Sequence, residues 1–282
     1  MTMVSVQHAK QFGIKLYDRW VRQQIRRNWE RAQKASTAHN LPRPLIVSLT
    51  SYPPRFETLD LTLRCLLAQS IRADKTILWI AHQDRPALTD GIKALESKGL
   101  TIRYCDDVRS HKKYAYAFRE FSDCFVVTAD DDAYYWPDWL AELVAGHALG
   151  TRDFACLRAH KIVFAPDGRP REYEQWEHNT ADSHASSAIF PTGLGGVLYR
   201  PAEMDPDVTN LDRAISLTPT ADDLWLYWMA RRAGICFRKV GPRRRFHNWT
   251  GTQATALYQV NSVLVNGNDV QVKAMIDAYG WP

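Results

Sequence analysis

The stretch CFVVTADDDAYYWPDW, residues 124–139, ends an apolar run with three consecutive carboxylates. A short apolar run that stops at polar residues is typical of a buried strand. Adjacent Asp side chains repel one another unless a cation, a helix N-terminus or solvent stabilises them. Side chains alternate along a strand, so Asp130 and Asp132 point to one side and Asp131 to the other. That pair is a candidate Mg²⁺ or Mn²⁺ site, because both ions prefer oxygen ligands. The other interpretation is an acidic cap on the WPDWLAEL helix, which Asp138 could supply alone.

Upstream of this stretch, short β-rich runs alternate with segments of helical spacing. The predicted strands are LIVSLTSY (45–52), KTILWIA (75–81), TIRYC (101–105) and CFVVTA (124–129). Helices are predicted between them, over LDLTLRCLLAQS (59–70), residues 86–98 and HKKYAYAFREF (111–121). This alternation predicts an α/β fold with a mostly parallel sheet flanked by helices. Ligands bind at the carboxyl ends of such strands, so we expect TSYPPR (50–55), CDDV (105–108) and ADDD (129–132) along one edge.

The second half of the chain is less regular and carries a second acidic pair. FACLRAH (154–160) and GGVLYRP (195–201) are predicted strands, and a C-terminal helix is predicted over 268–279. ADDLWLYWMARRAG (221–234) is a predicted helix closed by Gly234, with Asp222 and Asp223 at its start. Acidic residues there either stabilise the helix N-terminus or supply a general base. The tryptophans of both acidic segments either pack in the core or form flat platforms for planar or ring-shaped ligands.

The positive charge is concentrated near the N-terminus. Residues 10–34 contain eight Lys or Arg and two acids, a net charge of +6, whereas the whole chain has +5. Ile14, Tyr17, Val21 and Ile25 share one helical face of this segment. Such a helix either docks on protein or lies on an anionic membrane surface. The charge is not spread over a nucleic-acid-binding face, so no nucleic-acid partner is expected.

Several classes of protein are excluded by missing patterns. Five cysteines without a CxxC pair indicate free thiols in a reducing compartment, not a disulfide framework or a zinc cluster. No window of 18 apolar residues occurs, and the N-terminus lacks the features of a signal peptide. GxGxxG, P-loop and G-x-S-x-G motifs are absent. We therefore expect a cytoplasmic protein, with peripheral contact at the inner face of the cell membrane if residues 10–34 bind lipid.

Five stretches, in this order, resemble GT-A glycosyltransferases of the family 2-like, bacterial surface-polysaccharide type. They are IVSLTSYPPRF, CDDVRSHKKYAYAF, FVVTADDDAYYWPDW, GLGGVLYRP and DDLWLYWMARRAG, within about residues 45–240. The basic N-terminal helix and its linker, over 1–40, lie outside the matched stretches, and the resemblance implies a GT-A catalytic domain over 41–282. Within that domain it implies a nucleotide-sugar half over 45–135 and an acceptor half over 136–282.

The resemblance also implies roles for individual residues. Asp130 and Asp132 form the D-x-D motif that holds Mn²⁺ or Mg²⁺ on the donor diphosphate, with His247 as a third ligand in some members. Asp223, beside Asp222, is the candidate base that deprotonates the acceptor hydroxyl in inverting members. The donor, with UDP as the default nucleotide, is implied to contact Thr50, Ser51, Tyr52, Arg55, Asp106, Asp107, Lys113, Asp130, Asp131, Gly195 and Gly196.

The expected activity is metal-dependent sugar transfer from a nucleotide-diphosphate donor to a glycan or glycolipid acceptor, with inversion, in cell-surface polysaccharide biosynthesis. The sequence reads Asp-Asp where many inverting members have Glu-Asp, so either Asp222 or Asp223 is the base. Two alternatives remain open. One is a nucleotidyltransferase acting on a sugar phosphate, although TSYPPRF lacks the Gly-rich, Lys-containing loop usual for that class. The other is a catalytically silent, membrane-associated binding protein.

Overall fold

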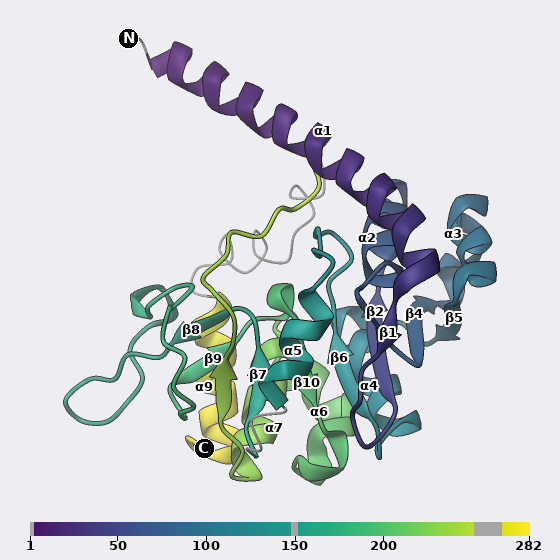
Figure 1. Cartoon of the computed structure of the whole chain (residues 1–282). Coiled ribbons are helices and arrows are strands. Elements are labelled where there is room, and N and C mark those ends of the chain that lie inside the picture. Colours follow the sequence, from purple (N-terminus) through teal and green to yellow (C-terminus); the bar gives the residue numbers. More distant parts are fainter. Residues whose placement is uncertain (1–2, 148–151, 251–266) are drawn as a thin grey trace.

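A sheet of seven strands forms the centre of the computed structural model, which describes residues 3–147, 152–250 and 267–282 (Figure 1). Within those residues the strand order is β11-β7-β10-β6-β2-β4-β5. The strands are β2 (Leu45–Thr50), β4 (Lys75–Ala81), β5 (Leu100–Cys105), β6 (Phe125–Thr128), β7 (Phe154–Cys156), β10 (Val197–Tyr199) and β11 (Phe237–Lys239).

The first half of this sheet is parallel, as the alternation of strands and helices predicts. β6, β2, β4 and β5 pair in parallel, so their carboxyl ends lie along one edge. The α/β fold with a mostly parallel sheet flanked by helices is thereby confirmed. The second half differs, because β10 runs antiparallel between β6 and β7. FACLRAH also forms two strands instead of one. After β7 the chain leaves the main sheet, and β8 (Ala159–Lys161) pairs with β9 (Ile189–Pro191).

The helices that flank the sheet mostly match the predicted positions. They are α2 (Phe56–Leu67), α3 (Asp90–Ala94), α4 (Lys112–Glu120), α5 (Trp139–His147), α6 (Leu211–Leu217), α7 (Asp222–Arg232) and α9 (Gly267–Tyr279). The predicted helix over 86–98 is shorter than expected. Pro86 lies in a 3-10 turn, Leu88 is extended, and the Thr89 side chain caps α3 at the backbone N–H of Ile92. The chain therefore turns helical only after residue 89.

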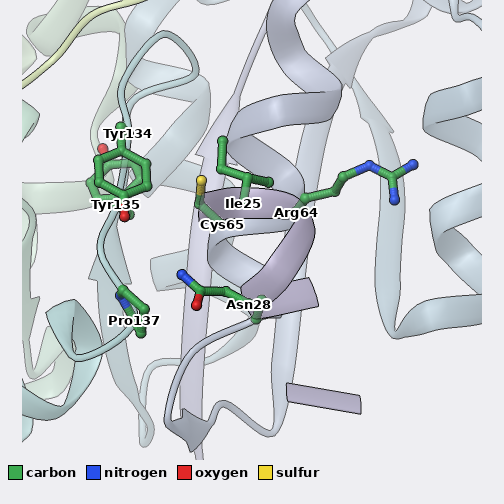
Figure 2. Close-up of a pocket in the computed structure, with 8 residues that line it drawn as sticks. Ile25, Asn28, Arg64, Cys65, Tyr134, Tyr135 and Pro137 are labelled. Carbon is green, nitrogen blue, oxygen red and sulfur yellow. The ribbon is translucent and has the colours of Figure 1, made fainter. Parts of the chain in front are cut away.

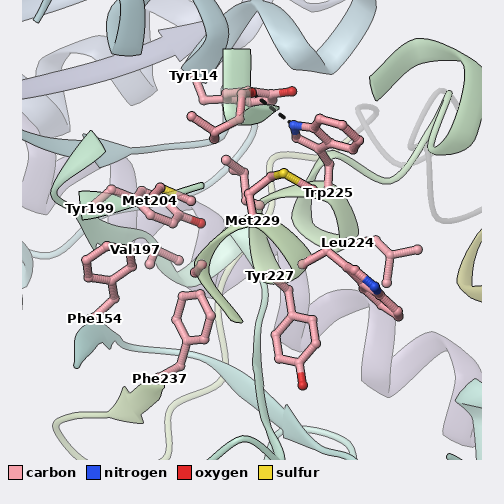
Figure 3. Packing of buried hydrophobic residues seen from close by; sticks show 14 of the residues in the cluster. Tyr114, Phe154, Val197, Tyr199, Met204, Leu224, Trp225, Tyr227, Met229 and Phe237 are labelled. Atoms are coloured by element: carbon pink, nitrogen blue, oxygen red, sulfur yellow. Dashed lines mark hydrogen bonds between the residues drawn. The ribbon is translucent and has the colours of Figure 1, made fainter. Parts of the chain in front are cut away.

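Buried side chains pack on both faces of the sheet. Neighbouring strand residues face opposite sides, so Ile46 belongs to one core cluster and Val47 to the other. Figure 3 shows the packing around α7, where the Trp225 indole N–H donates to the backbone oxygen of Val208 at 2.9 Å. The side chains of Trp139, Trp225 and Trp228 are fully buried. These tryptophans are therefore core residues and do not present a surface for stacking on sugars.

The N-terminal helix α1 (Met3–Ala35) begins earlier than the segment predicted from its charge and extends away from the body (Figure 1). Val21 and Ile25 are buried where α1 packs against α2. A cavity of about 10 Å³ remains at this contact, lined by residues of α1, α2 and the segment after β6 (Figure 2). The expected linker contains β1 (Thr37–Ala38), which pairs with β3 (Ile71–Arg72). Among the described residues, no helix has the length and apolar character needed to cross a membrane.

Candidate functional site

The loops after β2 and β6 meet at the carboxyl edge of the sheet, where Arg55 holds two members of the acidic triplet. One guanidinium nitrogen of Arg55, Nη1, lies 2.9 Å from Asp131 Oδ1 and 2.6 Å from Asp132 Oδ2. The Ser51 hydroxyl donates to Asp131 at 2.5 Å. Arg55 and both carboxylates are almost fully buried, so these charges depend on one another for compensation.

The three carboxylates of the triplet differ in their surroundings. The Asp131 side chain points into the protein, and burial raises its pKa to about 6, against the opposing effect of Arg55. Burial also raises the pKa of Asp132, again opposed by Arg55. Asp130 is the most exposed of the three, with 28% of its side chain accessible. The predicted alternation, with Asp130 and Asp132 on one side and Asp131 on the other, does not describe these surroundings: Asp131 and Asp132 both pair with Arg55 inside the protein, and Asp130 faces an accessible edge.

Lys113, at the start of α4, connects the triplet to the second acidic pair. Its ammonium lies 2.8 Å from Asp130 Oδ1 and 2.8 Å from Asp222 Oδ2. Burial alone lowers the pKa of Lys113, but Asp130, Asp222 and Asp223 raise it well above its ordinary value. Lys113 is therefore charged, and it brings together two acidic segments that lie far apart in the sequence.

Asp222 and Asp223 occupy the first turn of α7, where the helix dipole favours negative charge. The backbone N–H of Gly193 donates to Asp223 Oδ2 at 3.0 Å. Burial and the neighbouring Asp222 raise the pKa of Asp223 to about 7, and Lys113 opposes this rise. A carboxylate with a pKa near neutrality exchanges protons readily under physiological conditions.

Gly193 is the glycine that faces this cluster. A Cβ atom placed on Gly193 would lie 2.8 Å from Lys113 Nζ, 2.9 Å from Asp223 Oδ1 and 3.3 Å from Asp130 Oδ1. The two glycines expected at the ligand lie against protein atoms instead. A Cβ on Gly195 would meet the Arg158 backbone at 2.5 Å, and one on Gly196 would meet the Trp139 ring at 2.5 Å. Close packing within the protein accounts for both of these glycines.

The other expected donor contacts lie near this edge without joining the acidic cluster. The Thr50 hydroxyl donates to the Trp79 backbone oxygen at 2.8 Å. The Tyr52 ring lies 5.8 Å from the guanidinium carbon of Arg55. Asp106 and Asp107 are exposed at the end of β5, where Asp107 pairs with Lys112.

His247 lies close to the triplet through its backbone, but its ring is directed elsewhere. The backbone oxygen of His247 accepts from the Tyr134 N–H at 2.9 Å, while its Nε2 lies 3.1 Å from Asp18 of α1. The neighbouring Asn248 side chain hydrogen-bonds to Asp132 instead. Successive side chains of this extended segment point to opposite sides, which explains why Asn248 and not His247 faces Asp132. The part of RRRFHNWTGTQ after residue 250 lies outside the described residues.

The donor set that remains for a metal ion is Asp130 and Asp132. Within the described ranges, no three His, Cys, Asp or Glu side chains come together as a metal-binding group. The predicted trio that includes His247 is therefore not assembled. Mg²⁺ and Mn²⁺ sites often use only one or two carboxylates and complete their coordination with substrate phosphates and water. The two carboxylates are of the chemical type that such a site uses, and in this structure Asp132 pairs with Arg55 and Asp130 with Lys113.

Some residues of the site were not singled out from the sequence. Gly193 was part of a noted glycine-rich stretch, but nothing in the stretch shows which glycine faces the acids. Arg158, whose guanidinium donates to the Thr192 hydroxyl at 2.7 Å, is close enough for Asp223 and Asp130 to affect its pKa. Asn248 is the residue after the predicted ligand His247. Which of the two side chains faces Asp132 depends on how this extended segment is oriented, and the sequence does not show that.

No protein-family model matches the chain. No curated protein matches its sequence either. Among solved structures, it is similar to glucosyl-3-phosphoglycerate synthase from Mycobacterium tuberculosis in complex with Mn²⁺, UDP and glucosyl-3-phosphoglycerate. The identity is 14% and the TM-score 0.46, over 86% of this chain and 81% of that one.

Two further structures show a comparable likeness. S. aureus TarS 1–349 is 13% identical with a TM-score of 0.46, over 84% of this chain and 72% of that one. A 4-diphosphocytidyl-2C-methyl-D-erythritol synthase is 11% identical with a TM-score of 0.46, over 78% of this chain and 100% of that one. Likenesses at this level assign neither a family nor an activity to the chain.

Proposed function

We propose that this protein is a GT-A-type glycosyltransferase that moves a sugar from a nucleotide-diphosphate donor to a hydroxyl group of a glycan or glycolipid. The observation that carries the proposal is the meeting of two acidic groups around Gly193. Asp130 comes from the end of a parallel strand, Asp222 and Asp223 come from a helix start, and Lys113 lies between them. Sugar transfer needs charge stabilisation at the leaving diphosphate and a base at the acceptor, and these two groups can supply both.

Asp223 is the proposed base. Its side chain is less buried than that of Asp222, which is paired with Lys113. With a pKa of about 7, Asp223 is partly deprotonated at neutral pH and can accept a proton. It takes that proton from the acceptor hydroxyl while the acceptor oxygen bonds to the anomeric carbon and the bond from that carbon to the diphosphate oxygen breaks. Attack from the face opposite the leaving group inverts the anomeric configuration.

Asp130 and Asp132 are the residues that would hold Mn²⁺ or Mg²⁺. When bound, the ion would neutralise charge on the leaving diphosphate. Arg55 keeps Asp132 in place and Lys113 keeps Asp130 in place, whatever occupies the site. His247 is not included in this set, because its ring pairs with Asp18.

The division of the catalytic domain into two halves is part of this proposal. Residues 45–135 contain the parallel strands whose ends are proposed to bind the nucleotide sugar. Residues 136–282 contain Gly193 and the α7 acids, which are proposed to face the acceptor. A role in cell-surface polysaccharide synthesis is proposed with it, on the resemblance of the motifs.

Titration calorimetry with UDP and GDP, with and without Mn²⁺, tests this proposal. We expect nucleotide binding that depends on the metal, followed by release of the nucleoside diphosphate when a donor and an acceptor are supplied. Release of pyrophosphate from a nucleoside triphosphate and a sugar phosphate would instead identify a nucleotidyltransferase. Absence of metal-dependent nucleotide binding would contradict both enzyme hypotheses, the glycosyltransferase and the nucleotidyltransferase. The catalytically silent binding protein would then remain.

A peripheral membrane contact through residues 10–34 is proposed in addition. Ile14, Leu16, Tyr17 and Trp20 are all more than 40% exposed on α1. Arg19, Arg26 and Arg27 are exposed on the same helix. An apolar surface next to basic side chains is the combination that binds anionic lipid headgroups. The proposed location is the inner face of the cell membrane, where the acceptor glycolipid would lie.

A further inference from the structure

The ammonium group of Lys113 is the centre of the acidic cluster, although the resemblance places this residue at the nucleotide. Only 7% of its side chain is exposed, and its two ion pairs, to Asp130 and Asp222, are equally short at 2.8 Å. Asp223 lies close enough to affect it as well. Lys113 therefore faces acids from both sides of the site and has little surface left for a substrate.

The backbone of Lys113 is also fixed to the sheet. Its carbonyl oxygen accepts a hydrogen bond from the Ser48 hydroxyl of β2 at 2.5 Å. The Trp79 indole N–H of β4 donates to the same hydroxyl at 3.0 Å. Two central strands thus fix the backbone from which the Lys113 side chain extends, and the two ion pairs hold its ammonium between the acidic segments.

We propose that Lys113 is a positioning residue that joins the donor-side carboxylate Asp130 to the acceptor-side carboxylate Asp222 and holds the two halves of the site at their working separation. The charges support this role. Asp130, Asp222 and Asp223 carry a formal charge of −3 and Lys113 contributes +1. Without the ammonium, these carboxylates repel one another in a poorly solvated place and move apart.

A double-mutant cycle measures the connection without any substrate. Lys113→Met leaves the acids uncompensated, whereas Lys113→Met with Asp222→Asn removes one charge of each sign and keeps the formal total at −2. We expect the double variant to lose less melting temperature than the sum of the two single variants. It should also remain folded if Lys113→Met alone does not. A loss equal to the sum would overturn the connection.

Lys239→Met is the matched control for this cycle. Lys239, the last residue of the edge strand β11, is also buried, but its ammonium donates to the backbone oxygen of Gly241, just after that strand. Combined with Asp222→Asn, it should give an additive loss, because the two residues share no contact.

The second test rests on the proposed sugar transfer and separates positioning from folding. We expect Lys113→Met to weaken metal-dependent UDP binding about tenfold and to lower kcat about a hundredfold, whereas a base variant lowers kcat alone. Lys113→Arg keeps the positive charge, so its kcat should be at least about tenfold higher than that of Lys113→Met. A folded Lys113→Met protein with wild-type binding and kcat would refute the proposal. If the wild-type protein neither binds UDP nor transfers a sugar, the proposed glycosyltransferase function fails. The double-mutant cycle in melting temperature still tests whether Lys113 and Asp222 are coupled.

Discussion

The backbone N–H of Gly193 donates to the Asp223 carboxylate at 3.0 Å. This hydrogen bond aims the proposed base from a loop that belongs to another part of the chain. Because Gly193 has no side chain, its backbone can lie this close to Asp223, Lys113 and Asp130, where even a Cβ atom would come within 2.8 Å of Lys113 Nζ.

Gly193→Ala should therefore reduce activity through steric contact. Its φ is not in the left-handed region, so the backbone tolerates alanine, and the new methyl group meets Lys113 and Asp223 at under 3 Å. We expect kcat/KM to fall about tenfold or more, measured by nucleotide release, since small displacements at a reacting centre are costly.

Gly91→Ala in α3 is the matched control for Gly193→Ala. Its new methyl group has only the Thr89 hydroxyl within 4 Å, at 3.9 Å. It should raise the free energy of unfolding by about 0.4–1 kcal/mol and leave activity alone. Equal activity in the two variants would show that the close approach of Gly193 to Lys113 and Asp223 is not needed for catalysis.

The two acidic segments should separate binding from transfer. Asp223→Asn should lower kcat about 10²–10⁴-fold with donor affinity unchanged, because a general base acts only in the chemical step. Asp132→Ala should abolish metal-dependent donor binding in calorimetry. Loss of donor binding in both variants would contradict this division of roles.

The rate should depend on pH through Asp223. A base works only when deprotonated, so we expect kcat to rise with pH and to level off above about 7, where Asp223 is ionised. In Asp222→Asn, the like charge that raises the pKa of Asp223 is gone, and the midpoint should move to lower pH. A midpoint that stays in place in this variant would assign the titration to another group.

The Arg55 ion pairs should dominate stability at this edge of the sheet. Arg55→Met leaves Asp131 and Asp132 buried without their cation, and we expect a loss of about 3–5 kcal/mol in urea unfolding. Asp131 has a pKa of about 6 in the folded protein, above the ordinary value of 3.8. Its contribution to stability is therefore fully present below the unfolded pKa and declines as pH rises through about 6.

The Arg55→Met variant should also lose stability as the pH rises. Without Arg55 the folded pKa of Asp131 rises further, so the loss of stability should be larger at about pH 8 than at about pH 5. Arg64→Met, which removes a partly exposed pair with Asp60 on α2, should cost at most about 1 kcal/mol at either pH.

Binding to anionic vesicles should depend on the exposed apolar residues of α1. Leu16→Ser with Trp20→Ser should reduce co-sedimentation with phosphatidylserine vesicles about tenfold or more, because both side chains are about half exposed beside arginines. Val270→Ser removes an exposed apolar side chain from α9 and should change nothing. An unchanged sedimentation of the α1 variant would discard the membrane contact, and a change in oligomer size would indicate a protein partner instead.

The parallel half of the fold was predictable because its signals are local. The strands β2, β4 and β6 lie in mainly apolar runs that end at polar residues, and helical spacing fills the gaps. The antiparallel β10 was not predictable in the same way. Its pairing with both β6 and β7 is a long-range choice, and a three-residue strand such as Val197–Tyr199 carries no mark of its neighbours.

At the candidate site, the types of residue present were easier to predict than the orientations of their side chains. Asp130, the α7 pair and Lys113 lie together, because strand ends and a helix start share one edge. The orientation of His247 towards α1, and that of Asn248 towards Asp132, depends on the register of a segment without regular pairing. The role of Arg55 as the partner of two carboxylates likewise depends on a tertiary contact between two loops.

The contact between Asp18 and His247 has a consequence for how the chain matures. These residues are 229 positions apart, so the ribosome must add that many residues after Asp18 before the two can meet. α1 can settle on α2 early through Val21 and Ile25, whereas its contact with His247 has to wait for this later segment. During synthesis, the outward part of α1 therefore remains accessible to chaperones and lipids before the carboxyl edge is finished.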